Sequence, residues 1–353
     1  MKTFPIGDRL VGDAQPVYIV AEMSANHNGS SDQAVKIIEA AKAAGADAIK
    51  VQTYTADTIT IDSRKEYFRV GKGTLWEGRT LHDLYKEASM PWEWQPRLKK
   101  IAEAMGLGFF STAFDPTAVD FLEKLGVPVH KIASFELVDI PLIRKMAATG
   151  KPVILSTGMA SADEMQEAIE AVRAEGNENV MILRCTSAYP ARAGDMHLRS
   201  IPDMRERFQV PVGLSDHSLG HTAVAAAVSL GACLIEKHLT LSRKEDGPDS
   251  GFSLEPAEFA VMVACVRETE SALGDVFYGG TKSEKATKVF RCSLYVVKDV
   301  APGELFSADN VRSIRPGHGL HPRHLAEVIG RRAVRFVEKG TPMSWDLVDG
   351  GRR

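Results

Sequence analysis

Several features that would assign the chain to a special class of protein are scarce. Only four cysteines occur in 353 residues, without a Cys-x-x-Cys pair, which favours buried thiols in a reducing compartment. The 43 basic and 46 acidic side chains give a net charge of −3, so no basic excess supports nucleic-acid binding. No apolar run is long enough to cross a membrane, and the first residues lack the apolar core of a signal peptide. We therefore expect a cytoplasmic protein.

The composition is that of a folded α/β protein. Hydrophobic residues make up 44% and charged residues 25% of the chain, which excludes disorder, collagen and coiled coil for most of it. Strands are predicted at Val17–Met23, Ala46–Thr53, Leu107–Thr112, Val129–Ala133, Val153–Thr157, Val180–Thr186, Val212–Leu214 and Ala232–Leu239. Helices are predicted at Asp32–Ala44, Trp92–Met105, Pro116–Leu125, Pro141–Ala148, Ala162–Glu175, Leu198–Phe208, Thr222–Leu230 and Pro256–Leu273. Eight alternating pairs predict a (β/α)8 TIM barrel.

Three segments lie outside this repeat. Residues 1–16 are expected to form a hairpin that covers the bottom of the barrel. Residues 54–91 form a long, aromatic-rich insertion after the second strand, and we expect part of it to contact substrate because long loops at this end of a barrel are usually functional. We expect the barrel domain to occupy residues 1–280. The third segment follows it.

The C-terminal part of the chain has a different character. Residues 281–289 are polar and are predicted to be a linker. Residues 290–353 are predicted to form a small module with strands at Ser293–Val297 and Ala333–Phe336. A module of this size has little core of its own, so we expect it to pack on the barrel or on a second subunit.

Polar side chains recur where the predicted barrel strands end, which is the face that carries the active site of such barrels. The strand ends supply two lysines and several hydroxyls that would converge on one mouth: Lys50, Thr112, Lys131, Ser134, Ser156 and Ser215. Lysine provides a positive charge and hydroxyls provide neutral donors, so this set predicts a site for a phosphate and a carboxylate.

Two histidines end the neighbouring seventh and eighth strands. His217 and His238, with Glu22 nearby, could hold a divalent cation and leave positions for water and substrate. Each signal is weak alone, because a strand-end histidine is more often structural. Two other functions stay open on the residues alone: an aldolase that forms a Schiff base on Lys50 or Lys131, and a sugar-binding protein without catalysis.

Several segments, taken in order, resemble the sialic acid synthase family. They are Ile19–Gly29, Lys131–Ser134, Leu155–Met159, Gly213–His217 and Ile235–His238. The segment Ile314–Leu320 is similar to that family's antifreeze-like (SAF) domain, so the resemblance covers nearly the whole chain. It implies a TIM barrel followed by a small C-terminal SAF domain, a transferase activity and phosphoenolpyruvate as one substrate.

Details within the family resemblance favour one branch. The element Leu75-Trp76-Glu77-Gly78, the pair Leu84-Tyr85 and the segment Ala133–Glu136 are similar to the pseudaminic acid synthases. Ser187 stands where sialic and legionaminic acid synthases typically carry Asn. The resemblance therefore implies condensation of phosphoenolpyruvate with 2,4-diacetamido-2,4,6-trideoxy-L-altrose, with N-acetylneuraminate or legionaminate synthesis as the alternative.

The resemblance also implies roles for individual residues. It assigns a divalent metal (Mn²⁺, Mg²⁺ or Co²⁺) to His217 and His238. It adds Gln52 and Ser187 to the phosphoenolpyruvate set. Glu22 is the candidate to position or deprotonate the attacking water, and Glu236, Asp249 and Tyr189 match positions near the sugar. Asp216 is expected to orient His217.

One implied residue lies outside the barrel. Arg315 matches the family arginine that enters the active site of the other subunit from the SAF domain. The resemblance therefore implies a domain-swapped homodimer with small-molecule substrates and no nucleic-acid or membrane partner.

Overall fold

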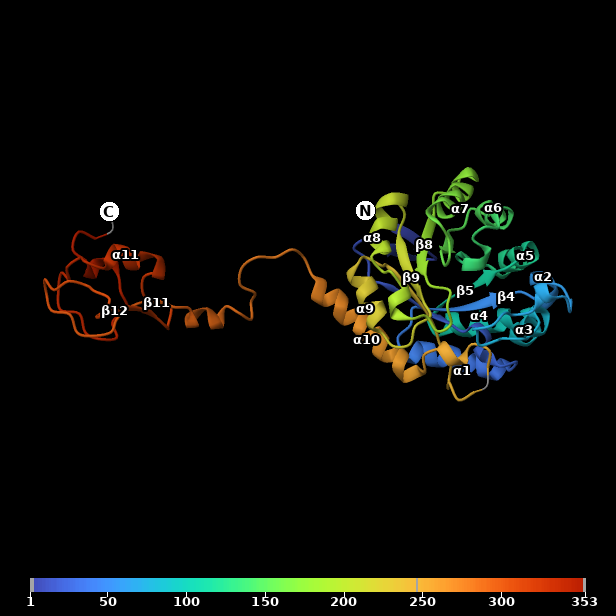
Figure 1. The fold of residues 1–353 in the computed structure, drawn as a ribbon, viewed down its shortest axis with the longest axis horizontal. Helices are drawn as coiled ribbons and strands as arrows, with labels where there is room; N and C mark the ends of the chain where they lie inside the picture. The colour runs from blue at the N-terminus through green and yellow to red at the C-terminus, as the bar shows by residue number, and fades with distance from the viewer. Residues whose placement is uncertain (1–2, 246, 352–353) are drawn as a thin grey trace. The chain divides into compact units, whose positions relative to one another are not determined.

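The computed structural model describes residues 3–245 and 247–351, and these form two compact units, Met1–Gly274 and Asp275–Arg353. The first unit is a closed barrel of eight parallel strands surrounded by helices, as predicted (Figure 1). The predicted limits of barrel, linker and module, at residues 280, 281–289 and 290, stay a prediction. Among the helices of the described residues, none is both long and apolar enough to span a membrane.

All eight predicted barrel strands are present, in the order expected from right-handed β-α-β connections. They are β3 (Tyr18–Glu22), β4 (Ala48–Thr53), β5 (Gly108–Ala113), β6 (His130–Ile132), β7 (Val153–Ser156), β8 (Val180–Cys185), β9 (Val212–Asp216) and β10 (Leu234–His238). Almost every residue in them is buried, because the inner face fills the barrel and the outer face packs on helices. The last strand begins two residues later than predicted, and β9 ends two residues later.

The eight predicted helices are also present. They are α1 (Ser31–Ala43), α4 (Gln95–Ala104), α5 (Pro116–Leu125), α6 (Ile140–Ala147), α7 (Ala162–Ala174), α8 (Ser200–Phe208), α9 (Thr222–Ser229) and α10 (Pro256–Leu273). Their ends follow the expected signals: Ser161 and Glu164 form a capping box at the start of α7, and Gly126 adopts the left-handed conformation (φ +73°) after α5.

The N-terminal hairpin is present as predicted. Strands β1 (Thr3–Ile6) and β2 (Arg9–Gly12) pair antiparallel, and Phe4 and Val11 are buried in the same core as the barrel. Arg9 forms an ion pair with Asp47, which immediately precedes β4. The hairpin therefore closes the amino-terminal end of the barrel.

The insertion after β4 folds into short helices. They are α2 (Ala56–Ile59), a 3₁₀ turn (Glu66–Phe68) and α3 (Leu81–Ala88), and a second 3₁₀ turn (Trp92–Trp94) leads into α4. Figure 1 shows α2 and α3 beside one another near β4 and α4. The insertion leaves the carboxyl end of β4 and so lies at the mouth of the barrel.

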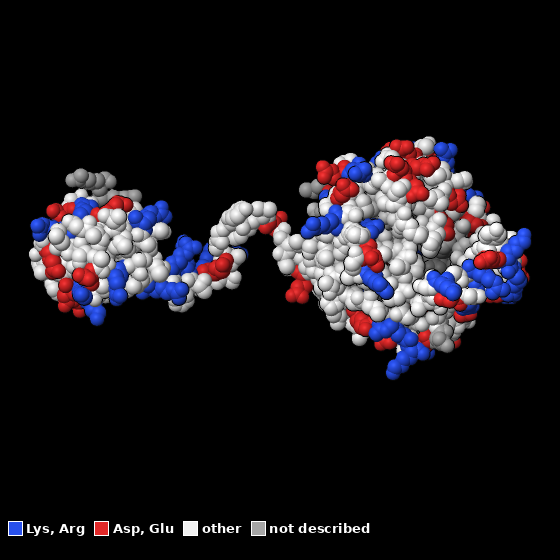
Figure 2. Space-filling model, in the orientation of Figure 1, with Lys and Arg blue, Asp and Glu red and all other residues white. Residues whose placement is uncertain are grey.

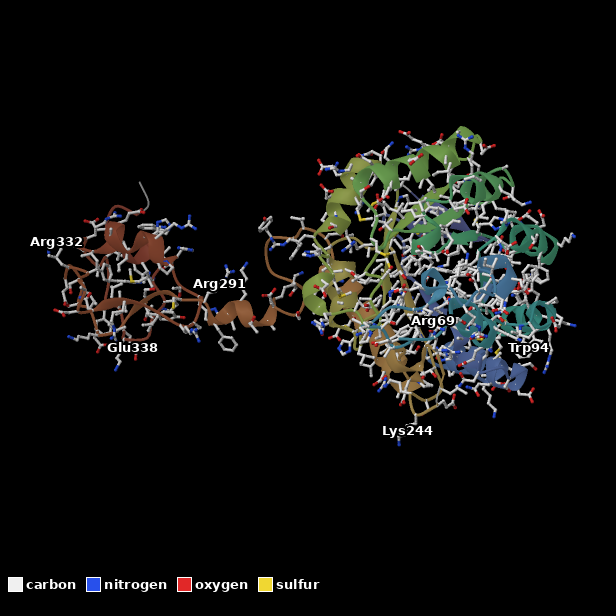
Figure 3. The ribbon with its side chains drawn as sticks, turned by 45° about the vertical axis from the view of Figure 1, so that its right-hand side comes forward. Arg69, Trp94, Lys244, Arg291, Arg332 and Glu338 are labelled. Atoms are coloured by element: carbon white, nitrogen blue, oxygen red, sulfur yellow. The ribbon has the colours of Figure 1, made fainter. Side chains whose placement is uncertain are left out.

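The C-terminal unit has a small core of its own. Strands β11 (Ser293–Val296) and β12 (Val311–Ile314) pair antiparallel, and a short helix α11 (Leu325–Val328) follows. Charged residues such as Arg332 and Glu338 project outward from it (Figure 3). The predicted strand Ala333–Phe336 is wrong. Ala333 makes only an isolated bridge to Val348, Val334 and Phe336 are exposed, and no neighbouring strand among the described residues continues the pairing.

Candidate active site

The parallel register of the barrel brings the predicted strand-end residues side by side. Glu22 is paired in register with Lys50 on one side and with His238 on the other. Thr112 is likewise paired with Gln52 and with Lys131. Because neighbouring parallel strands end at the same edge, these side chains face a common space.

That space is a cavity of about 480 Å³ at the mouth of the barrel. Twelve of the predicted site residues line it: Lys50, Gln52, Thr112, Lys131, Ser134, Ser156, Tyr189, Ser215, His217, Glu236, His238 and Asp249. Both signs of charge are interspersed over the visible face of the barrel unit (Figure 2), and the buried charges of Lys50, Lys131 and Glu236 line this cavity.

The remaining three predicted residues have different placements. Glu22 lies just behind the lining, where it contacts Lys50 and accepts a hydrogen bond from Gln52 at 3.2 Å. Ser187 lies 3.8 Å from the thiol of Cys185, which lines the cavity. Arg315 is an exposed residue of the C-terminal unit, immediately after β12.

Two buried ammonium groups form the charged floor. The Nζ of Lys50 lies 2.5 Å from Glu22 Oε2 and 3.5 Å from Glu236 Oε1, and it donates to Thr112 Oγ1 at 2.9 Å. Burial opposes the charged form of Lys50, but the two carboxylates outweigh it and raise its pKa. The floor therefore keeps a positive charge where an anion would bind.

Lys131 is held differently. Its Nζ donates to Ser156 Oγ at 2.6 Å and to the carbonyl of Ile132 at 2.8 Å. Burial lowers its pKa, while the charge of Glu236 acts in the opposite direction. Both of these hydrogen-bond partners are uncharged, which leaves the charge of Lys131 available to an incoming phosphate or carboxylate.

The two carboxylates on the floor differ in their proton affinity. Burial raises the pKa of Glu22, and Lys50 only partly offsets it. Burial also acts on Glu236, but the positive charges of Lys131, Lys50 and His217 outweigh it and lower its pKa. Glu22 therefore takes up a proton more readily, as a general base must, and Glu236 stays ionised.

The two predicted histidines are neighbours in the cavity. The ring centroids of His217 and His238 are 5.2 Å apart, and Phe252 packs against both rings. The Nδ1 of His217 lies 3.0 Å from the carbonyl oxygen of Thr186, a contact in which the ring must donate, so in the neutral ring the lone pair is on Nε2. The Nδ1 of His238 is buried and has no hydrogen-bond partner among the described residues. Burial, together with nearby positive charges, lowers the pKa of His238 well below its usual value, which keeps the imidazole neutral.

These features fit a divalent cation. A neutral imidazole is the form that ligates metals, and a carbonyl that fixes the tautomer is the usual support for such a ligand. Within residues 3–245 and 247–351, no group of three or more His, Cys, Asp or Glu side chains is arranged to hold a metal. The protein would thus supply two nitrogen ligands, and water or substrate the others.

One predicted role is wrong. Asp216 does not orient His217: it pairs with the buried Lys237, whose Nζ lies 2.6 Å from Asp216 Oδ2, and it accepts from the backbone N–H of Ser218. Side chains alternate along a strand, so Lys237 points away from Glu236 and His238. His217 is supported instead by Thr186 and by the thiol of Cys185, 3.8 Å from its Nδ1.

Cys185 lines the cavity, although its sequence context indicates no more than a buried core thiol. Burial would raise its pKa, but the charge of His217 and hydrogen bonds from His217, Ser134 and Ser187 lower it to about 7. The signal that could have identified it is its position as the last residue of β8. Other lining residues come from loops that follow strands, and no strand-end pattern marks them: Phe114, Glu136 and Phe252.

Fold and site together define a (β/α)8-barrel protein whose cavity, at the carboxyl ends of the strands, contains two buried lysines and a pair of histidines. The chain matches the NeuB family over residues 37–278 and the SAF domain over residues 291–349. The chain therefore belongs to the NeuB family and carries a C-terminal SAF domain, as its resemblance to the sialic acid synthases predicted.

Individual relatives agree with this assignment. The chain is 45% identical over 324 residues to a pseudaminic acid synthase of Campylobacter jejuni, covering 92% of this chain and 94% of the relative. It is 41% identical over 336 residues to the pseudaminic acid synthase of Helicobacter pylori, covering 95% and 98%. The structure is similar to the N-acetylneuraminic acid synthetase of Leptospira borgpetersenii crystallised with citrate, with a TM-score of 0.72, 31% identity and coverage of 81% and 95%.

Proposed function

We propose that this protein is a pseudaminic acid synthase. It condenses phosphoenolpyruvate with the open-chain aldehyde of 2,4-diacetamido-2,4,6-trideoxy-L-altrose and water, and it releases a nonulosonic acid and inorganic phosphate. The observation that carries the proposal is the joint presence, in one cavity, of two buried ammonium groups and two neighbouring histidines. Similarity to pseudaminic acid synthases at 41–45% identity supports the choice of sugar.

The floor would bind phosphoenolpyruvate. Lys50 and Lys131 neutralise its phosphate and carboxylate, and hydroxyl and amide groups donate further hydrogen bonds. The residues assigned to it are Lys50, Gln52, Thr112, Lys131, Ser134, Ser156, Ser187 and Ser215. Burial excludes water around these groups, which strengthens each charge interaction.

The histidine pair would hold the cation. His217 and His238 would bind Mn²⁺, Mg²⁺ or Co²⁺, which when bound supplies Lewis-acid polarisation of the aldehyde carbonyl. We expect thorough chelation to abolish activity and added metal to restore it. Retention of the full rate after chelation would remove the metal from the proposal.

The carboxylates complete the chemistry. C3 of the enol attacks the aldehyde carbon, and water adds at C2 of the former phosphoenolpyruvate. Glu22, whose pKa is raised by burial, takes the proton of that water. The tetrahedral intermediate then expels phosphate by cleavage of its C–O bond, while Glu236, Asp249 and Tyr189 position the sugar.

An assay with labelled substrate tests this function. Phosphoenolpyruvate carrying ¹⁸O in the bridge between C2 and phosphorus is incubated with metal and the altrose sugar. We expect a nonulosonic acid as product, with the label in the released phosphate. Parallel reactions with N-acetylmannosamine and the legionaminic acid precursor test the alternative sugars, and no product with any of the three would refute the synthase.

A lysine-dependent aldolase is the competing function, because burial lowers the pKa of Lys131 and so favours a nucleophilic amine. Borohydride reduction in the presence of pyruvate separates the two functions. A covalent pyruvate adduct on Lys131 or Lys50 would favour the aldolase, and an unmodified protein the synthase.

We also propose a domain-swapped homodimer that works in the cytoplasm. Arg315 would enter the active site of the other subunit from the SAF domain. The segment that begins the C-terminal unit supports an interface, since Val276, Phe277 and Tyr278 are 90%, 63% and 91% exposed in the single chain. Four free cysteines suit a reducing compartment.

A further inference from the structure

The cavity has two chemically different ends. The floor carries the ammonium groups, carboxylates and imidazoles described above. The part of the lining that comes from the 54–91 insertion carries no charged side chain, and its apolar members include Ile59, Val70, Leu81, Leu84 and Tyr85. Phe114, from the loop after β5, adds another apolar side chain. We call Leu81, Leu84, Tyr85 and Phe114 the apolar wall.

The apolar wall is packed in place. The ring of Tyr54, which is 4% exposed, makes edge contacts with Tyr85 at 5.8 Å and with Phe114 at 5.0 Å. Its backbone carbonyl accepts a hydrogen bond from the indole N–H of Trp92 at 3.1 Å. A surface held in this way is pre-formed, so it can discriminate between ligands without first ordering a loop.

The insertion is also tied to the opposite rim of the cavity. The indole N–H of Trp76 donates to the carbonyl of Pro248 at 3.0 Å, and its ring packs on Tyr189 at 5.6 Å. Asp249 and Tyr189, assigned above to the sugar, thus lie next to the insertion. The insertion that carries most of the wall thus reaches the sugar end of the cavity.

The proposed sugar has methyl-bearing groups where a plain hexosamine has hydroxyls. Compared with N-acetylmannosamine, it carries an acetamido group at C4 and a methyl group at C6. Both lie at the end of the sugar remote from the aldehyde that must meet the histidines and the enol. An apolar surface favours methyl groups and gives no partner to a hydroxyl.

Resting on the proposed function, we propose that the apolar wall binds the C4 acetamido methyl and the C6 methyl of the sugar and so selects diacetamido-trideoxy sugars over N-acetylmannosamine. Leu81, Leu84, Tyr85 and Phe114 are its specificity-determining residues. A hydrophobic pocket discriminates by about 10- to 200-fold for each methylene-sized group. The 54–91 insertion is therefore the part of the chain that sets the acceptor.

The test compares two matched substitutions within the insertion. L81N places an amide of similar size in the wall, whereas I61N introduces the same amide in place of an isomeric side chain that is 59% exposed and does not line the cavity. The quantity measured is the ratio of kcat/KM for the altrose sugar to kcat/KM for N-acetylmannosamine. We expect L81N to lower this ratio at least 10-fold, with the KM for phosphoenolpyruvate unchanged and with I61N equal to the wild type.

The possible outcomes separate the two proposals. A wild-type enzyme that does not use the altrose sugar refutes the proposed function. A wild-type enzyme that prefers that sugar, with an unchanged ratio in L81N, overturns the role of the wall even if overall activity falls. If L81N does not fold, L81A removes the same contact without adding a polar group, and it is expected to lower the ratio in the same direction.

Discussion

Lys237 is an example of a buried charge that supports the site without facing the cavity. It is fully buried on β10, and it binds both Asp216 and the carbonyl of Ser218. These two residues flank His217, so one ammonium group fixes the backbone on both sides of a proposed metal ligand. Its charge is balanced by the carboxylate of Asp216 in a dry environment, which makes the pair sensitive to loss of either partner.

We expect K237M to lower the free energy of unfolding by about 3–5 kcal/mol, because it leaves Asp216 buried without its cation. Denaturant unfolding measures this change. The double variant K237M/D216N should recover part of the loss, since it leaves no unpaired charge.

A surface pair provides the control for Lys237. The ammonium group of Lys99 lies 2.7 Å from the carboxylate of Glu103 on α4. K99M should lower the free energy of unfolding by only about 0.5 kcal/mol. If K237M were no more destabilising than K99M, the buried pair would not support the strand ends as described.

Glu136 is a half-buried carboxyl group that lines the cavity. Burial raises its pKa to about 7; a backbone hydrogen bond and Lys131 oppose this shift, and Asp139 adds to it. One of its carboxylate oxygens is buried and meets no hydrogen-bond partner in the described part of the chain. The folded protein therefore holds a proton there that the unfolded chain, with a pKa near 4.5, has already lost.

The sign of the resulting pH dependence follows from linkage. A carboxyl whose folded pKa is raised contributes stability below about pH 4.5 and loses it as pH rises through about 7. Between about pH 4.5 and pH 8, the free energy of unfolding of the wild type should therefore fall by up to about 3 kcal/mol more than that of E136Q. Unfolding measured at both pH values checks this, with E39Q at an exposed position as control. Parallel pH profiles for the wild type and E136Q would show that Glu136 ionises normally.

At the scale of the elements, the barrel depends on close approaches between neighbouring strands, and Gly213 in β9 lies at one of them. A Cβ at this position would lie 2.6 Å from the carbonyl oxygen of Leu234 and 2.6 Å from a methyl carbon of Leu183. The neighbouring strands therefore require the absence of a side chain at this point.

G213A should lower the free energy of unfolding by about 1–3 kcal/mol, because β9 must shift to make room for the methyl group. It should also lower kcat, because β9 carries Ser215 and leads into His217. Thermal unfolding and phosphate release measure the two effects. G71A is the matched control, as its added methyl meets no described atom within 4 Å. Wild-type stability in G213A would mean that the strands accommodate the methyl without strain.

The elements of the barrel were predictable because strands and helices differ in their apolar period, and the strand-end rule then located most of the cavity lining. Two kinds of feature could not be predicted from the sequence. The C-terminal unit uses short strands and isolated bridges, so Ala333–Phe336 has a strand-like composition without a strand partner among the described residues. The Asp216–Lys237 pair depends on the register between β9 and β10, which no local pattern encodes.

The whole molecule consists of a barrel that holds the chemistry and a small unit that carries Arg315. If Arg315 enters the active site of the other subunit, a chain that lacks His238 and a chain that lacks Arg315 can together form one complete site. H238A alone should lower kcat about 100-fold or more, since it removes one proposed metal ligand. R315A alone should lose binding of the sugar.

A heterodimer of H238A and R315A chains, isolated with two different tags, should regain activity. One of its sites combines an intact His238 with an intact Arg315, whereas neither homodimer has such a site. Phosphate release by the purified heterodimer measures this complementation. Activity no higher than that of the two homodimers would place Arg315 in its own subunit or outside the reaction.

The β1–β2 hairpin has a consequence for the order of events. Because it seals the amino-terminal end of the barrel, whatever reaches the floor enters and leaves by the opening beside the insertion. A sugar seated against the apolar wall would block that passage. If so, we expect phosphoenolpyruvate to bind before the sugar, and phosphate to leave after the nonulosonic acid.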